Sequence, residues 1–140
     1  MSQSWTILLE MPPVAKGRPR FGNGRTYTPR ATRTFEASAK ALMRSQFIMQ
    51  PLVGPVSVEI EFVFHRPIRP KHKSAHIVKP DVDNLIKAAL DAGNGILWDD
   101  DAQVCEIKAR KLYADAPVSP RVIMVIKPYT SVPSSSRDLK

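Results

Sequence analysis

Residues 79–104 read Lys79-Pro-Asp-Val-Asp-Asn-Leu-Ile-Lys-Ala-Ala-Leu-Asp-Ala-Gly-Asn-Gly-Ile-Leu-Trp-Asp-Asp-Asp-Ala-Gln-Val104. Six of the thirteen acidic residues of the chain lie between Asp81 and Asp101, and a single base, Lys87, shares that span. The span has a charge of −5, whereas the whole chain has a formal charge of +8. The simplest explanation for an acidic segment inside a basic protein is a divalent cation that carboxylates hold and present to a polyanion.

The same stretch predicts a helix that begins at the acidic residues. Pro80 disfavours helical backbone at Lys79, so Asp81 or Asp83 can cap a helix that continues through Leu90. The sequence Gly93-Asn94-Gly95 predicts a left-handed residue where that helix ends. Two carboxylates are therefore expected where the chain enters the helix.

The spacing of the remaining charges suggests a shared site. Lys87 lies one helical turn after Asp83, and the triplet Asp99-Asp100-Asp101 follows the helix after a short turn. We expect this triplet to fold back toward the same end of the helix, where hard oxygen ligands suit Mg2+. The alternative is that these aspartates only cap helices and turns, which is their commoner role.

Two motifs resemble the RusA-type Holliday junction resolvases, which are crossover junction endodeoxyribonucleases. Residues 80–89 are similar to the Asp-x-Asp-Asn-x-x-Lys signature of that family, and residues 98–104 are similar to its Asp-Asp pair before a strand. The resemblance also includes Met11-Pro12-Pro13 and the Arg-, Gly- and Thr-rich segment that follows, so it covers roughly residues 5–127.

The resemblance implies roles for individual residues. Asp81, Asp83 and Asp101 match the catalytic, metal-binding carboxylates, and Lys87 matches the catalytic lysine. The family has two consecutive aspartates where this chain has three. Alignment on Ala102-Gln103-Val104 selects Asp101 as the catalytic member, with Asp100 as a neighbouring metal ligand and Asp99 as the extra residue.

The resemblance also implies cofactors and partners. It implies Mg2+, with Mn2+ as an alternative ion, and no nucleotide cofactor. It implies branched DNA, the four-way junction, as the substrate. A junction has two-fold symmetry and this chain shows no internal repeat, so a two-fold symmetric homodimer is expected.

Composition restricts the class of protein. The length of 140 residues suits one domain, and 43% hydrophobic residues suffice for a core. Lys and Arg outnumber Asp and Glu by 21 to 13, which favours nucleic acid as a partner ahead of an anionic membrane surface. The sequence has neither a membrane-spanning apolar run nor a secretory signal, and its one cysteine, Cys105, excludes an internal disulfide. A cytoplasmic location is expected.

Two segments supply most of the positive charge. Residues 14–33, here called the arm, contain six bases and no acid: Lys16, Arg18, Arg20, Arg25, Arg30 and Arg33. Glycines and Pro19 predict an irregular backbone. The arm is either a solvated loop or a phosphate-binding element, and its density of arginine favours the second interpretation. Phe21 and Tyr27 are then available to stack on exposed bases.

Residues 65–79, here called the flap, are also basic and contain no acid. Their bases are Arg66, Arg69, Lys71, Lys73 and Lys79. Three histidines, His65, His72 and His76, raise the question of zinc. Prolines oppose the helix that a His72–His76 pair needs, and no cysteine is near, so a flexible DNA-binding flap is favoured.

Hydrophobic periodicity predicts the fold. Strands are expected at Trp5–Glu10, Val56–Phe64, 105–113 and Arg121–Lys127, and a helix is expected from Thr28-Pro29 to a point before Pro51. This order predicts an α/β fold: a single small domain over residues 1–127, with a mixed β-sheet and helices packed on one face. Residues 128–140 are expected to be a disordered Ser/Pro-rich tail.

Together these features predict a Mg2+-dependent, structure-selective endodeoxyribonuclease that resolves Holliday junctions by paired nicks in DNA recombination and repair. One alternative is a nuclease of the same chemistry that acts on other branched or duplex DNA. The other is a non-catalytic basic module that binds nucleic acid.

Overall fold

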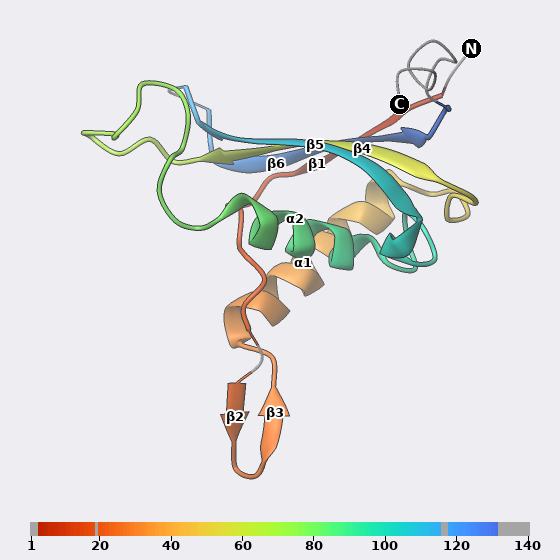
Figure 1. The fold of residues 1–140 in the computed structure, drawn as a ribbon, viewed down its shortest axis with the longest axis horizontal. Helices are drawn as coiled ribbons and strands as arrows, with labels where there is room; N and C mark the ends of the chain where they lie inside the picture. The colour runs from red at the N-terminus through yellow and green to blue at the C-terminus, as the bar shows by residue number, and fades with distance from the viewer. Residues whose placement is uncertain (1–2, 19, 116–117, 132–140) are drawn as a thin grey trace, which may run out of the picture.

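A four-stranded mixed sheet is covered on one face by two helices (Figure 1). The computed structural model describes residues 3–18, 20–115 and 118–131. The elements in chain order are β1 (Trp5–Leu9), β2 (Arg20–Gly22), β3 (Arg25–Tyr27), α1 (Arg30–Gln46), β4 (Val56–Phe64), α2 (Val82–Gly93), the 3-10 turn η1 (Asp101–Gln103), β5 (Val104–Tyr113) and β6 (Arg121–Pro128). The predicted α/β class, with a mixed sheet and helices on one face, is confirmed.

The sheet topology places the acidic stretch between two parallel strands. The strand order is β1-β6-β4-β5, in which β4 and β5 run parallel and the other pairs run antiparallel. Parallel neighbours need a crossover connection, and here that connection contains α2 and η1. The acidic residues therefore lie on a crossover whose two ends the sheet fixes.

The core lies between the sheet and the helices. Alternate residues of β4, namely Val56, Val58, Ile60 and Phe62, are buried toward α1 and α2. The C-terminal end of α2 packs closely on the turn after it, because a Cβ atom at Gly93 would lie 2.9 Å from Trp98 Cζ2. The Trp98 indole also donates a hydrogen bond to Asn94 Oδ1 at 3.0 Å. This packing fixes the end of the turn after α2, at which residues 99–101 begin.

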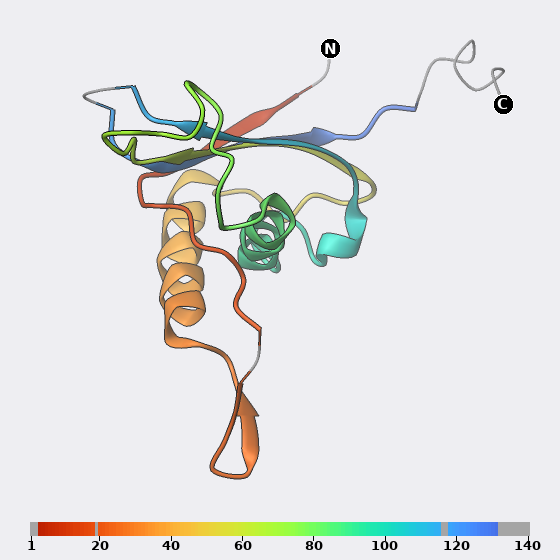
Figure 2. The same ribbon diagram turned by 60° about the vertical axis from the view of Figure 1, so that its left-hand side comes forward.

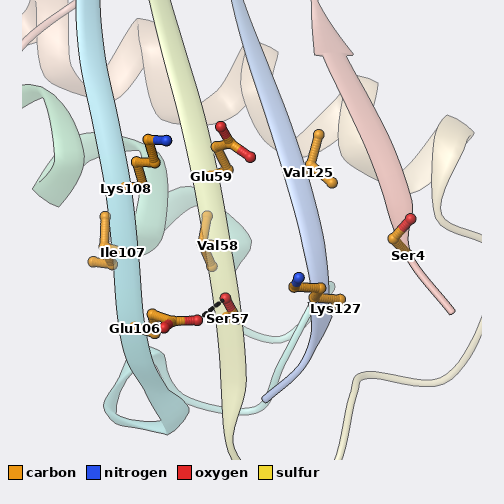
Figure 3. A pocket seen from close by; sticks show the side chains of 9 residues that line it. All are labelled: Ser4, Ser57, Val58, Glu59, Glu106, Ile107, Lys108, Val125 and Lys127. Carbon is orange, nitrogen blue, oxygen red and sulfur yellow. Dashed lines mark hydrogen bonds between the residues drawn. The ribbon is translucent and has the colours of Figure 1, made fainter. Parts of the chain in front are cut away.

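The other face of the sheet is open and has charges of both signs. A hollow of about 470 Å3 on this face is lined by residues that include Glu59, Glu106, Lys108 and Lys127 (Figure 3). The Ser57 hydroxyl donates a hydrogen bond to Glu106 Oε1 at 2.7 Å. Because acids and bases are interspersed, this face lacks the uniform positive charge of a DNA-binding surface.

Two predicted details differ in the structure and one is confirmed. The arm contains the β2–β3 hairpin, not an irregular backbone, because Asn23 (φ 53°) and Gly24 (φ 77°) form the left-handed pair that a two-residue hairpin turn needs. Helix α1 begins at Arg30 with Pro29 as its N-cap, one residue later than the predicted start, in which Thr28 is the N-cap and Pro29 the first helical residue. The left-handed residue predicted within Gly93-Asn94-Gly95 is confirmed: it is Gly95 (φ 82°), and Asn94 is extended.

The predicted tail begins inside the last strand. Strand β6 includes Pro128, and the Tyr129 amide donates a hydrogen bond to Pro55 O at 2.9 Å. Residues 132–140, the rest of the predicted tail, lie outside the described residues. No helix within the described ranges is long and apolar enough to cross a membrane.

Candidate active site

The N-terminal end of α2 carries Asp81 and Asp83, both exposed. Asp81 occupies the N-cap position as predicted, but its side chain makes no capping hydrogen bond; it pairs with the Lys79 ammonium at 3.0 Å. The Lys111 ammonium, from β5, donates to the carbonyl oxygens of Val78 at 2.8 Å and Pro80 at 2.7 Å. The backbone just before Asp81 is thereby tied to the sheet.

One flank of α2 presents alternating charge. Asp83, Lys87 and Asp91 recur every fourth residue, so they lie on neighbouring turns, about 6 Å apart along the axis. Lys87 is exposed between the two acids. The lysine that the resemblance marks as catalytic therefore lies on the same flank as both carboxylates.

The Asp101 carboxyl lies at the C-terminal end of this flank. Burial is the largest influence on it, followed by hydrogen bonding to the Asp91 and Asp100 carboxyls, and together they raise the pKa of Asp101 to about 6. The backbone N–H of Ala102, ahead of the contact with Asp101, lowers the pKa of Asp100. Three acidic side chains are thus grouped where α2 ends and η1 begins.

The turn that holds this group is built by Gln103. Its Oε1 accepts from the amides of Asp99 at 2.9 Å and Asp100 at 3.2 Å, while Asp100 Oδ1 accepts from Ala102 N in return. The Gln103 amide also donates to Leu52 O at 2.9 Å and Gly54 O at 3.0 Å. These bonds hold the aspartate turn against the loop before β4.

Lys16 lies beside the same acids. Its ammonium contacts Glu36 Oε1 at 2.9 Å and Asp91 Oδ2 at 3.2 Å, and its amide donates to Asn84 O at 2.9 Å. The hydrogen bond to Glu36 is the main cause of a raised pKa for this ammonium, with Asp91 adding to it and burial opposing it. Lys16 therefore neutralises acids in the folded chain, although the sequence predicted a DNA contact.

We expected the aspartate triplet to fold back to the N-terminal end of α2, and the structure shows that it does not. Asp101 contacts Asp91, which lies eight residues after Asp83, or about 12 Å along a helix. The reason is the packing of Trp98 on Gly93, which reverses the chain at the far end of α2. Within the described ranges, no group of three or more Asp, Glu, His or Cys side chains is arranged to hold a metal ion. The set Asp81, Asp83 and Asp101 is thus not assembled around one point, whereas the Asp91–Asp101 pair has the oxygen-donor chemistry that a hard cation takes.

Comparison with known proteins identifies the family of the chain. Residues 10–127 match the family described as endodeoxyribonuclease RusA. The chain belongs to the RusA endodeoxyribonuclease family. It is also similar to YqaN, an uncharacterized protein of Bacillus subtilis (strain 168), at 33% identity over 82% of this chain and 89% of that protein. The family-level resemblance inferred from the aspartate motifs is confirmed.

Membership establishes the class of reaction. This RusA-family chain is an endodeoxyribonuclease, a hydrolase that acts on DNA. Nucleases of the family generally depend on a divalent metal and act on Holliday junction DNA. The roles of individual residues stay predictions.

Most of the bases predicted to bind DNA in this RusA-family chain have exposed side chains. They are Arg18, Arg25, Arg30, Arg69, Lys71, Lys73 and Lys79. Arg20 begins strand β2. Arg66 is partly buried, donates to Lys73 O at hydrogen-bond distance and lies over the Tyr113 ring. Its contacts hold the flap to the end of β5.

The flap contacts the sheet where it returns toward α2. His76 is buried, with its ring stacked on Phe64 at 3.8 Å between centroids, and its amide donates to Lys111 O at 3.1 Å. Burial, and then the charge of Lys111, lowers the pKa of His76. His72 Nδ1 accepts from the amides of Ser74 and Ala75. The His72 side chain thus bonds the flap backbone, whereas the His76 ring packs on Phe64.

Sequence reasoning missed Asp91 and Lys111. The fourth-residue spacing of Asp83, Lys87 and Asp91 was a signal that pointed to Asp91. Lys111 carried no such signal, because a lysine that holds carbonyl oxygens and one that binds phosphate look alike in a basic strand.

Proposed function

We propose that this RusA-family enzyme resolves Holliday junctions by metal-dependent nicking of two symmetry-related strands. The observation that carries the proposal is the charged flank of α2, with Asp83, Lys87, Asp91 and Asp101 on one side of the molecule. In Figures 1 and 2 the flap lies near one end of α2, η1 lies at the other, and the β2–β3 hairpin projects from the same side of the sheet. An acidic centre bordered by basic elements is the arrangement that a metal-dependent nuclease needs.

The family resemblance makes Asp81, Asp83, Asp101 and Asp100 the proposed metal ligands, although the first two lie at the N-terminal end of α2 and the last two at its C-terminal end. The proposed ion is Mg2+, with Mn2+ as the alternative. A bound ion would lower the pKa of a coordinated water and would shield charge on the scissile phosphate. Other residues of the chain stabilise charge and position the carboxylates. Lys87 lies where an ammonium stabilises the developing phosphate charge. Asp91, held by Lys16, supports Asp101 by direct contact.

The basic segments are proposed to bind the DNA backbone without reading its sequence. Arg18, Arg25 and Arg30 of the arm, with Arg69, Lys71 and Lys73 of the flap, are exposed and face solvent with no acid in either segment. Contacts to phosphate position a protein on DNA but carry no base information. Selectivity for a junction must therefore come from the shape of the branch.

Two copies of the chain are proposed to act together. The charged flank occurs once among the residues that the structure describes, and a junction needs two nicks at related phosphates. A two-fold symmetric homodimer supplies both sites with the symmetry of the substrate.

The decisive experiment is cleavage of a synthetic four-way junction with and without Mg2+, beside a flap substrate and a linear duplex of the same sequence. Paired nicks restricted to the junction, and lost on Asp83→Asn, are expected. Equal cleavage of flap or duplex would favour the alternative of a nuclease with the same chemistry and another substrate. The non-catalytic alternative is set aside because the family is an enzyme family.

A further inference from the structure

The β2–β3 hairpin holds an aromatic side chain in solvent. The hairpin pairs Arg20 with Tyr27, Phe21 with Thr26 and Gly22 with Arg25, and it projects away from the sheet beyond the start of α1 (Figures 1 and 2). Phe21 is 77% exposed. Two paired strands of three residues bury too little surface to be stable alone. Folding of the hairpin therefore does not explain a large exposed apolar side chain near its tip.

Tyr27 has an intramolecular partner and Phe21 faces solvent. The Tyr27 ring covers Gly22, where a Cβ atom would lie 3.1 Å from Tyr27 Cε1. Phe21 pairs with Thr26, one position along, and remains mostly in solvent. Single exposed apolar residues such as Ile48, Val53 and Ile68 are ordinary on protein surfaces. Phe21 differs because it is aromatic and stands between exposed Arg18 and Arg25 in a segment without acids.

The hairpin is anchored at the acidic centre. Lys16, which contacts Asp91, comes five residues before Phe21, and the Gly17 amide donates to Thr32 Oγ1 at 2.9 Å. Five residues span at most about 17 Å, or about five nucleotide steps of 3.4 Å. The arm is thus a spacer of limited length between the cutting site and an exposed aromatic ring.

We propose that Phe21 inserts at the branch point of DNA and stacks on an unpaired or unstacked base, which makes it the residue that selects branched over linear duplex DNA. The inference rests on the proposed function, because it supplies the selectivity that phosphate contacts lack. Every base offers a flat face to an aromatic ring, so stacking needs no particular sequence. Bases at a branch are free to leave the stack, whereas those inside a continuous duplex are held by neighbours on both sides. The limited reach of the arm places the cut within about five nucleotides of the branch.

The test measures binding, in EDTA and on the Asp83→Asn background, so that no cleavage occurs. The ratio of junction affinity to duplex affinity should fall about tenfold in Phe21→Ala and in Phe21→Leu, and should be kept in Phe21→Trp. The Phe21→Leu variant separates the two properties, because leucine keeps the apolar character of phenylalanine without its flat ring. Ile68→Ala, at a 99% exposed aliphatic residue of the flap, is the matched control and should leave the ratio unchanged.

A direct reporter completes the test. Emission from Phe21→Trp, above the constant background of Trp5 and buried Trp98, should be quenched by a junction and not by a duplex. Ile68→Trp should show no such difference. An unchanged affinity ratio in Phe21→Leu, or equal quenching by both DNAs, overturns the proposal. Weakened self-association in Phe21→Ala with an intact ratio overturns it as well and assigns the ring to a second copy of the chain. The parent chain is assayed in parallel for Mg2+-dependent junction cleavage, so failure of the proposed function is seen separately.

Discussion

The Asp101 carboxyl lies against the Asp91 carboxyl at the C-terminal end of α2, and its pKa is raised to about 6. Burial is the largest reason that the ionised form of Asp101 is disfavoured, and the neighbouring Asp91 and Asp100 carboxyls add to it. Ionisation of Asp101 in the absence of metal therefore lowers the free energy of unfolding of this RusA-family chain.

We predict that Asp101→Asn raises thermal stability in EDTA at pH 7 to 8. The pKa of Asp101 is raised from 3.8 to about 6 on folding, so the folded chain holds this proton more tightly than the unfolded chain. Ionisation therefore lowers stability as pH rises from about 4 through 6, and the stabilising effect of Asn should grow over that window and vanish near pH 4. Scanning calorimetry at several pH values checks this. Asp99→Asn is the control and should behave like the parent; a gain that is equal at pH 4 and pH 8 would contradict the prediction.

We predict that Lys16 and the arginines of the arm act differently on DNA affinity. Neutralising Arg18, Arg20 and Arg25 together should flatten the slope of log affinity against log salt by roughly one unit per lost phosphate contact. Lys16→Met should leave that slope unchanged and lower the free energy of unfolding by about 1 to 2 kcal/mol, because Glu36 and Asp91 lose a shared partner. Salt titrations of binding and urea unfolding separate the two effects. A flatter slope in Lys16→Met would contradict this prediction and would show that Lys16 contacts a DNA phosphate, as the sequence suggested.

We predict that Lys111→Met impairs cleavage without changing DNA contacts. The ammonium holds Val78 O and Pro80 O just before Asp81, so its loss should cost about 2 kcal/mol of stability and loosen the backbone that carries Asp81. Single-turnover cleavage should slow while junction affinity changes little. Lys108→Met, at an exposed residue of the same strand, is the matched control and should stay within about 0.5 kcal/mol of the parent. Identical behaviour of the two variants would contradict the prediction that Lys111 positions the backbone that carries Asp81.

We predict that Lys87→Ala lowers turnover far more than junction affinity. A residue that acts only on the transition state changes kcat, whereas a surface partner of Asp83 and Asp91 contributes a few tenths of a kcal/mol to stability. Comparison of kcat with the dissociation constant of the junction measured in EDTA decides between them. Equal losses in both quantities would assign Lys87 to substrate binding.

Local pattern was enough to predict most of the fold. The alternation of Val56, Val58, Ile60 and Phe62 predicted β4 with the bounds that the structure has. The helix that begins after Asp81 also follows from nearby residues, because Pro80 and the first-turn acid act within a few positions. The hairpin was missed because the glycines and Pro19 of the arm were interpreted as keeping the backbone irregular, although the dipeptide Asn23-Gly24 favours the turn between two strands.

The arrangement of the site depends on long-range packing that a sequence does not display. Asp101 reaches Asp91, and not Asp81, because Trp98 packs on Gly93 and Gln103 bonds to the loop before β4. In the same way, Lys16 and Lys111 have the chemistry of DNA-binding lysines, and only the folded chain shows that their ammonium groups are engaged by carboxylates and carbonyl oxygens.

The place of β6 in the sheet has a consequence for synthesis of the enzyme. Strand β6 lies between β1 and β4, so within the described residues β1 pairs only with a strand that is made more than 100 residues later. The sheet beneath α2 cannot close until residues 121–128 have left the ribosome. The acidic stretch and the β4–β5 pair that flanks it are therefore made before the strand that completes the sheet.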